Sequence, residues 1–124
     1  MKTYSLENLS DQALSRDLDA EVARTCAATA SLLAHLAEFD ARKLYVPAGY
    51  PSMFAYCLGR YPFCEQAVYK RIRAARAARR FPAIFPALAD GRLHLSGVVL
   101  LAPHLTEETA GELLAAAEHK NMAE

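Results

Sequence analysis

Apolar and polar residues recur with helical spacing along the first third of the chain. Apolar or small side chains appear every three or four residues from Leu14 to Phe39, which predicts one long amphipathic helix over about 5–42. Ser5 or Ser10, each followed by acidic residues, can cap its start. The apolar stripe suits either one wall of a core or a surface for docking or dimerisation.

A short helix and a longer helix are predicted next, joined by a turn. The segment 44–51 (LYVPAGYP) contains two prolines and a glycine, and it ends the first helix. Ser52 can cap a short helix, a break follows at Pro62, and a basic helix starts near Cys64. The unit at 51–81 therefore has a helix-turn-helix-like order. Its apolar side chains suit a shared core: Cys57, Tyr61, Phe63, Val68 and Ile72.

The last third, at about 82–120, is predicted to form short helices separated by prolines and by a turn at Asp90 and Gly91. Many alanines and few β-branched residues favour helices over strands. A chain of 124 residues can bury about two thirds of its unfolded surface. We therefore expect one all-α, compact multi-helix domain at 1–124, with a long N-terminal helix and a helix-turn-helix-like central pair.

The formal net charge of zero conceals an uneven distribution. Residues 1–41 carry seven acidic and three basic side chains, residues 42–81 carry one and nine, and residues 82–124 carry six and two. The net charges of the three parts are therefore −4, +8 and −4. Because salt screens exposed charges beyond about 8–10 Å, the basic centre can attract phosphate locally in a neutral protein. The alternative is that the acidic parts fold over the centre and neutralise it.

The basic centre coincides with the predicted helix at 64–80, CEQAVYKRIRAARAARR. At 100° per residue, small and apolar residues fill one side of this helix. The other side carries a narrow stripe made of Tyr69, Arg73, Arg76 and Arg80. One face can therefore be buried while the other stays cationic. Such a stripe is either a solvated face or a surface that binds anions.

Several kinds of site find no support in the sequence. No stretch is long and apolar enough to span a membrane and the N-terminus lacks the apolar core of a signal peptide, so we expect a cytoplasmic protein without membrane contact. Three cysteines (Cys26, Cys57 and Cys64) and four scattered histidines match no metal motif. No catalytic triad, paired acids or glycine-rich phosphate loop is recognisable. We expect no metal and no small-molecule cofactor.

Several blocks of the sequence resemble a known family. The runs GYPSMFAYC, AVYKRIRAARAARRFPAI and ADGRLHLSGVVLLAPHLT, together with AHLAEFDARKLY in the first helix, are similar to the N-terminal helical region of a bacterial family of HNH endonucleases. The similarity spans nearly the whole chain. A second likeness, to the helix-turn-helix region of ParB-type partition proteins, covers the central helix pair and DGRLHLS and rests on pattern.

The resemblance implies a helical domain of uncharacterised role that precedes a nuclease module in the family. That module uses metal-binding and general-base histidines in a ββα fold, whereas this chain stops at Glu124 before any such segment. We therefore expect no catalytic residue here, and His119 is not part of that motif. Cys64 stands where the family commonly has a serine that caps the basic helix, and a thiol is a poor acceptor for backbone N–H groups.

The leading hypothesis is a DNA-binding or target-positioning domain that performs no chemistry by itself. In a helix-turn-helix unit the first turns of the second helix reach base edges, and neighbouring cations contact phosphates of double-stranded DNA. The predicted contact residues are Gln66, Tyr69, Lys70, Arg73, Arg76, Arg80 and Arg60. The alternative is a protein-interaction or dimerisation module, in which the basic helix pairs with acidic segments and the N-terminal helix contacts a second copy.

Overall fold

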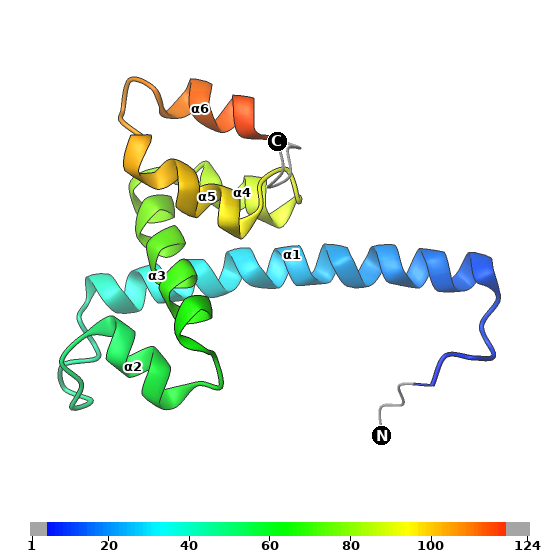
Figure 1. The fold of residues 1–124 in the computed structure, drawn as a ribbon, viewed down its shortest axis with the longest axis horizontal. Coiled ribbons are helices and arrows are strands. Elements are labelled where there is room, and N and C mark those ends of the chain that lie inside the picture. The colour runs from blue at the N-terminus through cyan, green and yellow to red at the C-terminus, as the bar shows by residue number, and fades with distance from the viewer. Residues whose placement is uncertain (1–4, 119–124) are drawn as a thin grey trace.

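The computed structural model describes residues 5–118, which form six α-helices and one 3₁₀ helix (Figure 1). The elements are α1 (Asp11–Ala41), α2 (Met53–Arg60), α3 (Glu65–Arg80), α4 (Ile84–Ala89), α5 (Leu95–Leu101), η1 (Ala102–His104) and α6 (Ala110–Ala117). No strand occurs among these residues, so the all-α prediction is confirmed. The end of the predicted C-terminal helical region, with His119, lies outside the described residues.

The long helix α1 begins at Asp11 and not near residue 5, so of the two predicted caps Ser10 is confirmed and Ser5 is wrong. Ser10 is the N-cap, and its Oγ accepts a hydrogen bond from the backbone N–H of Ala13 at 3.1 Å. This bond satisfies one of the free donors in the first turn. The helix cannot extend further back because a separate turn, closed by the Leu9 N–H donating to the Leu6 carbonyl at 3.1 Å, precedes the cap.

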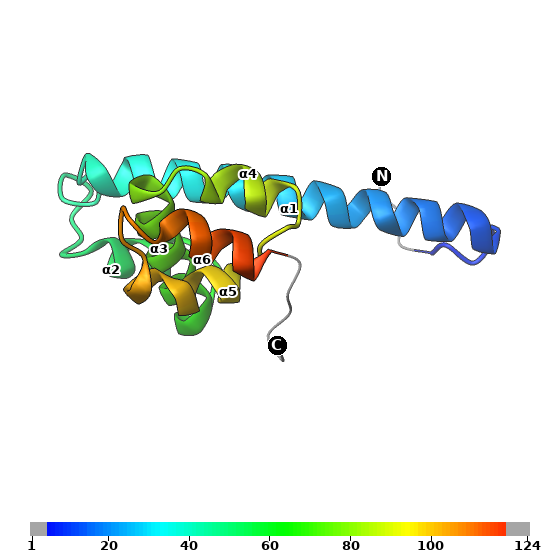
Figure 2. The ribbon, with the colours of Figure 1, turned by 90° about the horizontal axis from the view of Figure 1, so that it is seen from above.

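Among residues 5–118, only the C-terminal half of α1 packs against other elements. Its buried residues are Ala30, Leu33 and Ala37. In the N-terminal half the same apolar stripe is open to solvent, with Leu14 41%, Leu18 61% and Val22 55% exposed. Figures 1 and 2 show this half extending well beyond the other helices. The stripe is therefore a wall of the core in one half of α1 and an uncovered surface in the other.

The helix α3 is the central element, because it contributes to both clusters of buried side chains. The larger cluster joins it to α1, α4, α5 and α6, and its contribution is Ala74, Ala75 and Ala78. The smaller cluster joins it to α2, through Met53, Tyr56, Cys57, Val68 and Ile72. Leu36 of α1 packs against both clusters. The alanines allow a close approach of the neighbouring helices, since they leave little side chain between the backbones.

The α2–α3 pair combines a capped helix with an uncapped one. Ser52 accepts a hydrogen bond from the Ala55 N–H at 3.0 Å and caps α2. Cys64 occupies the N-cap position of α3 but makes no side-chain cap hydrogen bond, as predicted for a thiol. The prediction that Tyr61 is buried in this pair is wrong, because the residue is 43% exposed and its ring meets that of Tyr56 edge-on from outside.

The short elements after α3 close one end of the larger cluster. Gly91 has a φ of 78°, a left-handed conformation that glycine adopts without strain, and the chain turns there between α4 and α5. Arg92 then donates to Glu118 at 2.6 Å and ties this turn to the end of α6. Before α6, the hydroxyls of Thr106 and Thr109 each accept a hydrogen bond from the other's backbone N–H at 3.2 Å. This reciprocal pair fixes the turn that leads into α6.

Candidate nucleic-acid interface

One face of α3 is exposed and carries most of the predicted contact residues. Gln66 and Tyr69 lie in its first turns, and Arg73, Arg76 and Arg80 follow at intervals of three or four residues. The opposite face holds the alanines of the larger cluster, which are buried. The predicted division of this helix into a buried side and a cationic side is therefore confirmed.

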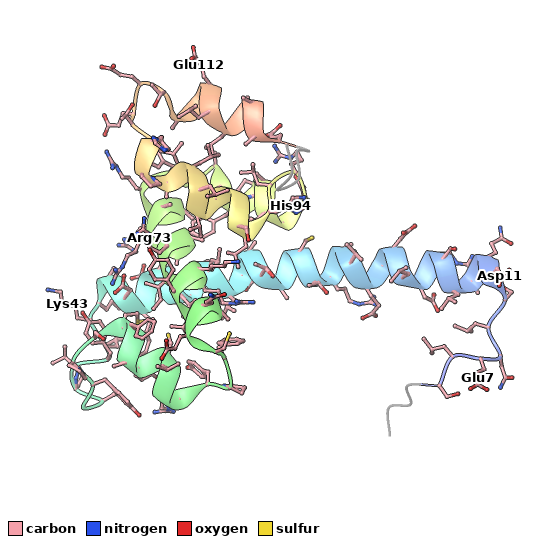
Figure 3. The ribbon with its side chains drawn as sticks, in the orientation of Figure 1. Glu7, Asp11, Lys43, Arg73, His94 and Glu112 are labelled. Atoms are coloured by element: carbon pink, nitrogen blue, oxygen red, sulfur yellow. The ribbon has the colours of Figure 1, made fainter. Side chains whose placement is uncertain are left out.

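Three arginines of this face converge on a shallow groove of about 310 Å³. Its lining is Arg73, Arg76, Ala77, Arg80, Phe81, Ala102 and Pro103. No acidic side chain belongs to this lining. Figure 3 shows Arg73 at the opposite end of the molecule from the acidic residues Glu7 and Asp11. The groove therefore concentrates positive charge in one concave site, a field that suits phosphate or another anion.

Arg76 is held by an ion pair with the end of α1. Its Nε donates to Asp40 Oδ2 at 2.8 Å and its Nη2 donates to Oδ1 at 3.2 Å. This two-point contact raises the pKa of Arg76, and the carboxylate is only 17% exposed. The guanidinium stays mostly exposed and still lines the groove. A phosphate at Arg76 therefore has to compete with, or share, the Asp40 carboxylate.

Glu38 forms one ion pair within the end of α1 and a second one that joins α1 to α3. Glu38 Oε2 accepts from Arg42 Nε at 2.7 Å, and its Oε1 accepts from Arg79 Nη1 at 3.0 Å. The hydrogen bond from Arg42 and then that from Arg79 lower the pKa of Glu38. The acidic end of α1 thus neutralises part of the basic helix, through Glu38 and Asp40, and leaves the rest of its charge exposed.

Two of the predicted contact residues have other packing roles. Lys70 is half-buried and its Nζ donates to the Ser96 Oγ of α5 at 3.2 Å, so it ties α3 to α5. Arg60, at the end of α2, lies over the ring of Tyr56 with its Cζ 5.4 Å from the centroid. Neither residue lines the groove. The structure therefore brings together only part of the predicted set.

Arg73 and Arg80 keep their charge available. Among residues 5–118 neither forms an ion pair. The Arg73 guanidinium lies 5.4 Å from the centroid of Tyr69, and that of Arg80 lies 5.0 Å from the centroid of Phe81. Cation–π contacts orient the side chains without neutralising them. These two arginines are the strongest candidates for contacting an anion in the groove.

Sequence reasoning missed an apolar pocket of about 300 Å³ between α1, α2 and the start of α3. Leu32, His35 and Leu36 line it from α1. Arg71 lines it from α3, with its Nη1 donating to the Ala67 carbonyl at 3.1 Å and its guanidinium stacked on a phenylalanine ring. Periodicity indicated that Leu32 and Leu36 belong to the apolar face of α1. The cavity itself depends on how α1, α2 and α3 pack together, which periodicity does not predict.

Within residues 5–118 no group of three or more His, Cys, Asp or Glu side chains could hold a metal ion. None of the helices that the structure describes is long and apolar enough to cross a membrane. Comparison with known proteins found no match: no protein-family model, no curated protein and no solved structure matches this chain. A functional conclusion must therefore come from α3 and its groove.

Proposed function

We propose that this domain binds double-stranded DNA through the exposed face of α3 and acts as a DNA-binding or target-positioning module. The observation that supports this most directly is the convergence of Arg73, Arg76 and Arg80 on one groove without acidic lining. A duplex carries closely spaced phosphates, and cations that approach them release condensed counterions.

The exposed face divides into two parts with different roles. The guanidiniums of Arg73 and Arg80 suit phosphate oxygens. Arg76 can add a third contact when phosphate replaces the Asp40 carboxylate as its partner. Gln66 and Tyr69 lie at the other end of the same stripe, on the first turns of the helix. Side chains in those turns reach base edges in helix-turn-helix proteins, whereas phosphate contacts fix the position of the helix.

The number of available cations sets the expected strength of binding. Three or four phosphate contacts correspond to a slope of about −3 to −4 in a plot of log affinity against log salt concentration. Non-specific binding of a lone domain is expected at roughly 10⁻⁴ to 10⁻⁶ M at physiological salt. Tighter binding requires additional contacts from a second copy or another module.

Fluorescence anisotropy of a labelled duplex at several salt concentrations tests the proposal. Replacing Arg73 and Arg80 together by alanine should flatten the salt slope by about two, because two phosphate contacts are lost. Arg80 is exposed and Arg73 is half-buried on the side of α3 away from the buried alanines, so circular dichroism should show an intact fold. Arg16→Ala is the matched control, since it removes a cation from the exposed half of α1 and should leave the slope unchanged. Equal slopes for the wild type and the double variant would overturn the proposal.

The alternative function, a protein-interaction module built on the basic helix, has less support from the contacts of α3. Its acidic partners in the structure, Asp40 and Glu38, belong to the same chain. These contacts need no second protein. The surface that favours self-association lies elsewhere, on α1.

A further inference from the structure

Two apolar surfaces of α1 are left uncovered by residues 5–118. One is the stripe on the projecting half, and the other is the apolar pocket beside the packed half. They form one strip along the helix, made of Leu14, Leu18, Val22, Thr25, Thr29, Leu32 and Leu36. The intervals in this strip are three or four residues throughout, so its members share one face of α1.

We propose that a second copy of the chain covers this strip, with the two α1 helices antiparallel and each N-terminal end seated at the pocket of the other copy. A two-fold axis that crosses the helix pair at the level of residue 23 places Leu14 of each copy opposite Leu32 of the other. Leu9, which precedes the helix and is 38% exposed, then lies at the mouth of the second copy's pocket. Because the pairing is symmetric, each copy both fills a pocket and has its own pocket filled.

The shape of the molecule permits this pairing. Residues 14 and 32 are separated by about 27 Å along a straight helix, at 1.5 Å per residue. The described elements other than α1 gather at its C-terminal half, and the N-terminal half stands clear of them in both views (Figures 1 and 2). Two antiparallel copies can therefore overlap along the strip while their folded parts lie at opposite ends.

Charged residues beside the strip favour the same register. Glu21 and Arg24 form an ion pair within one chain, and both remain exposed. In the antiparallel pair, Arg24 of one copy comes within about one residue of Glu21 of the other, twice by symmetry. These two symmetric pairs of opposite charge favour the antiparallel arrangement.

The area required by a specific dimer explains why the pocket takes part. A contact strip about 30 Å long and 10 Å wide covers roughly 300 Å² of each helix. Pairing of the two helices alone would thus bury roughly 600 Å² in total, well below the 1,200–2,000 Å² of standard specific interfaces. The two pockets add apolar area at both ends of the strip. We expect a dimer with a dissociation constant in the micromolar range.

Sedimentation velocity from low to high micromolar concentration tests the dimer. The wild type should shift from monomer to dimer, and Leu18→Asp should raise the dissociation constant by about a hundredfold or more, because two buried leucines are lost per dimer. Ala27→Asp is the matched control, since it places the same charge on the opposite, exposed side of α1. A wild type that stays monomeric, or equal effects of the two substitutions, would contradict the proposal.

Cysteine cross-linking tests the register without relying on dimer stability. In a background with Cys26 and Cys64 replaced by serine and the pocket residue Cys57 replaced by alanine, a variant with Leu14→Cys and Leu32→Cys should form a covalent dimer on mild oxidation. The two positions are about 27 Å apart in one chain, too far for an internal disulfide. Leu14→Cys alone should stay monomeric on denaturing gels. Cross-linking of this single variant, or none in the double variant, would rule out the antiparallel register.

The dimer and the proposed DNA binding are separable. None of the strip residues lines the groove of α3. Leu18→Asp should therefore abolish the dimer but leave the salt slope for DNA binding by each domain unchanged. The double variant Arg73→Ala, Arg80→Ala should have a flatter salt slope but should sediment like the wild type.

Discussion

Single side chains decide how much positive charge α3 presents to solvent. Arg76 and Arg79 engage carboxylates of α1, so part of their charge is neutralised. Arg73 and Arg80 lie against aromatic rings and keep their charge. Arg79 and Arg80 also occupy the last turn of the helix, where cations interact favourably with the helix dipole. Arginines of the same helix, α3, therefore hold α1 and are proposed to bind phosphate. Substitution of Asp40 removes one ion pair to α1 and leaves the arginines in place.

Asp40→Asn should tighten duplex binding. The substitution removes the carboxylate that competes with phosphate for Arg76, so the salt slope should steepen by about one. The accompanying loss of a partly exposed ion pair should cost up to about 1 kcal/mol of folding free energy. Asp17→Asn makes the same charge change on the projecting half of α1 and should have little effect on the slope. Unaltered affinity and slope in Asp40→Asn would show that the carboxylate does not compete with phosphate for Arg76.

Cys64→Ser should stabilise the start of α3. The residue already has N-cap geometry, with φ −74° and ψ 168°, and lacks only a good acceptor. A serine Oγ can accept a hydrogen bond from the N–H three residues on, as Ser52 does at the start of α2. We expect about 1 kcal/mol more stability in urea unfolding. Cys64→Ala should give no gain, and an equal gain from both would attribute the effect to loss of the thiol.

At the scale of elements, periodicity predicted the helices, but it did not predict which parts of each helix other elements cover. Leu14 and Leu33 belong to the same apolar pattern of α1, yet one is exposed and the other fully buried. The difference comes from α3 and α4, which pack only on the C-terminal half. A pattern along one segment carries no information about a distant partner. The ion pair between Arg76 and Asp40, 36 residues apart, was unpredictable for the same reason.

Local chemistry was the most predictable part of the fold and of the site. The cap at Ser52 and the missing cap at Cys64 follow from side chains within a few residues of each helix start. The positions of Arg73 and Arg80 on one stripe follow from their spacing. The groove itself does not, because Pro103 becomes its wall only where η1 lies against α3. The side chains that share one face of α3 were thus predictable, whereas the groove that they line depends on the tertiary structure.

The two halves of α1 should differ in amide hydrogen exchange. Packing protects residues 30–40, whereas residues 15–27 rely on their own helical hydrogen bonds, which are marginal in short isolated helices. In dilute, monomeric protein, we expect residues 15–27 to exchange at least about tenfold faster. Raising the concentration should slow their exchange as the second copy covers the strip. Equal protection of both halves in dilute solution would show that the projecting half is stable by itself.

For the whole molecule, α3 is the helix that contributes buried residues to both clusters. Val68 and Ile72 belong to the smaller cluster, and Ala74, Ala75 and Ala78, which follow directly, belong to the larger one. Leu36 bridges the two from α1. Neither cluster can form its full set of contacts unless α3 is helical along its length. We therefore expect the two clusters to unfold together as one cooperative unit.

Ile72→Ala tests this cooperativity. The side chain is buried in the smaller cluster, so its truncation should cost about 2–5 kcal/mol. Tyr45, Tyr50 and Tyr56 pack in or against that cluster, so near-ultraviolet dichroism follows it, whereas far-ultraviolet dichroism follows every helix. If α3 couples the clusters, both signals should change at the same, lower denaturant concentration. An earlier loss of the tyrosine signal alone would mean that the smaller cluster unfolds by itself while α1, α4 and α5 still hold the groove end of α3.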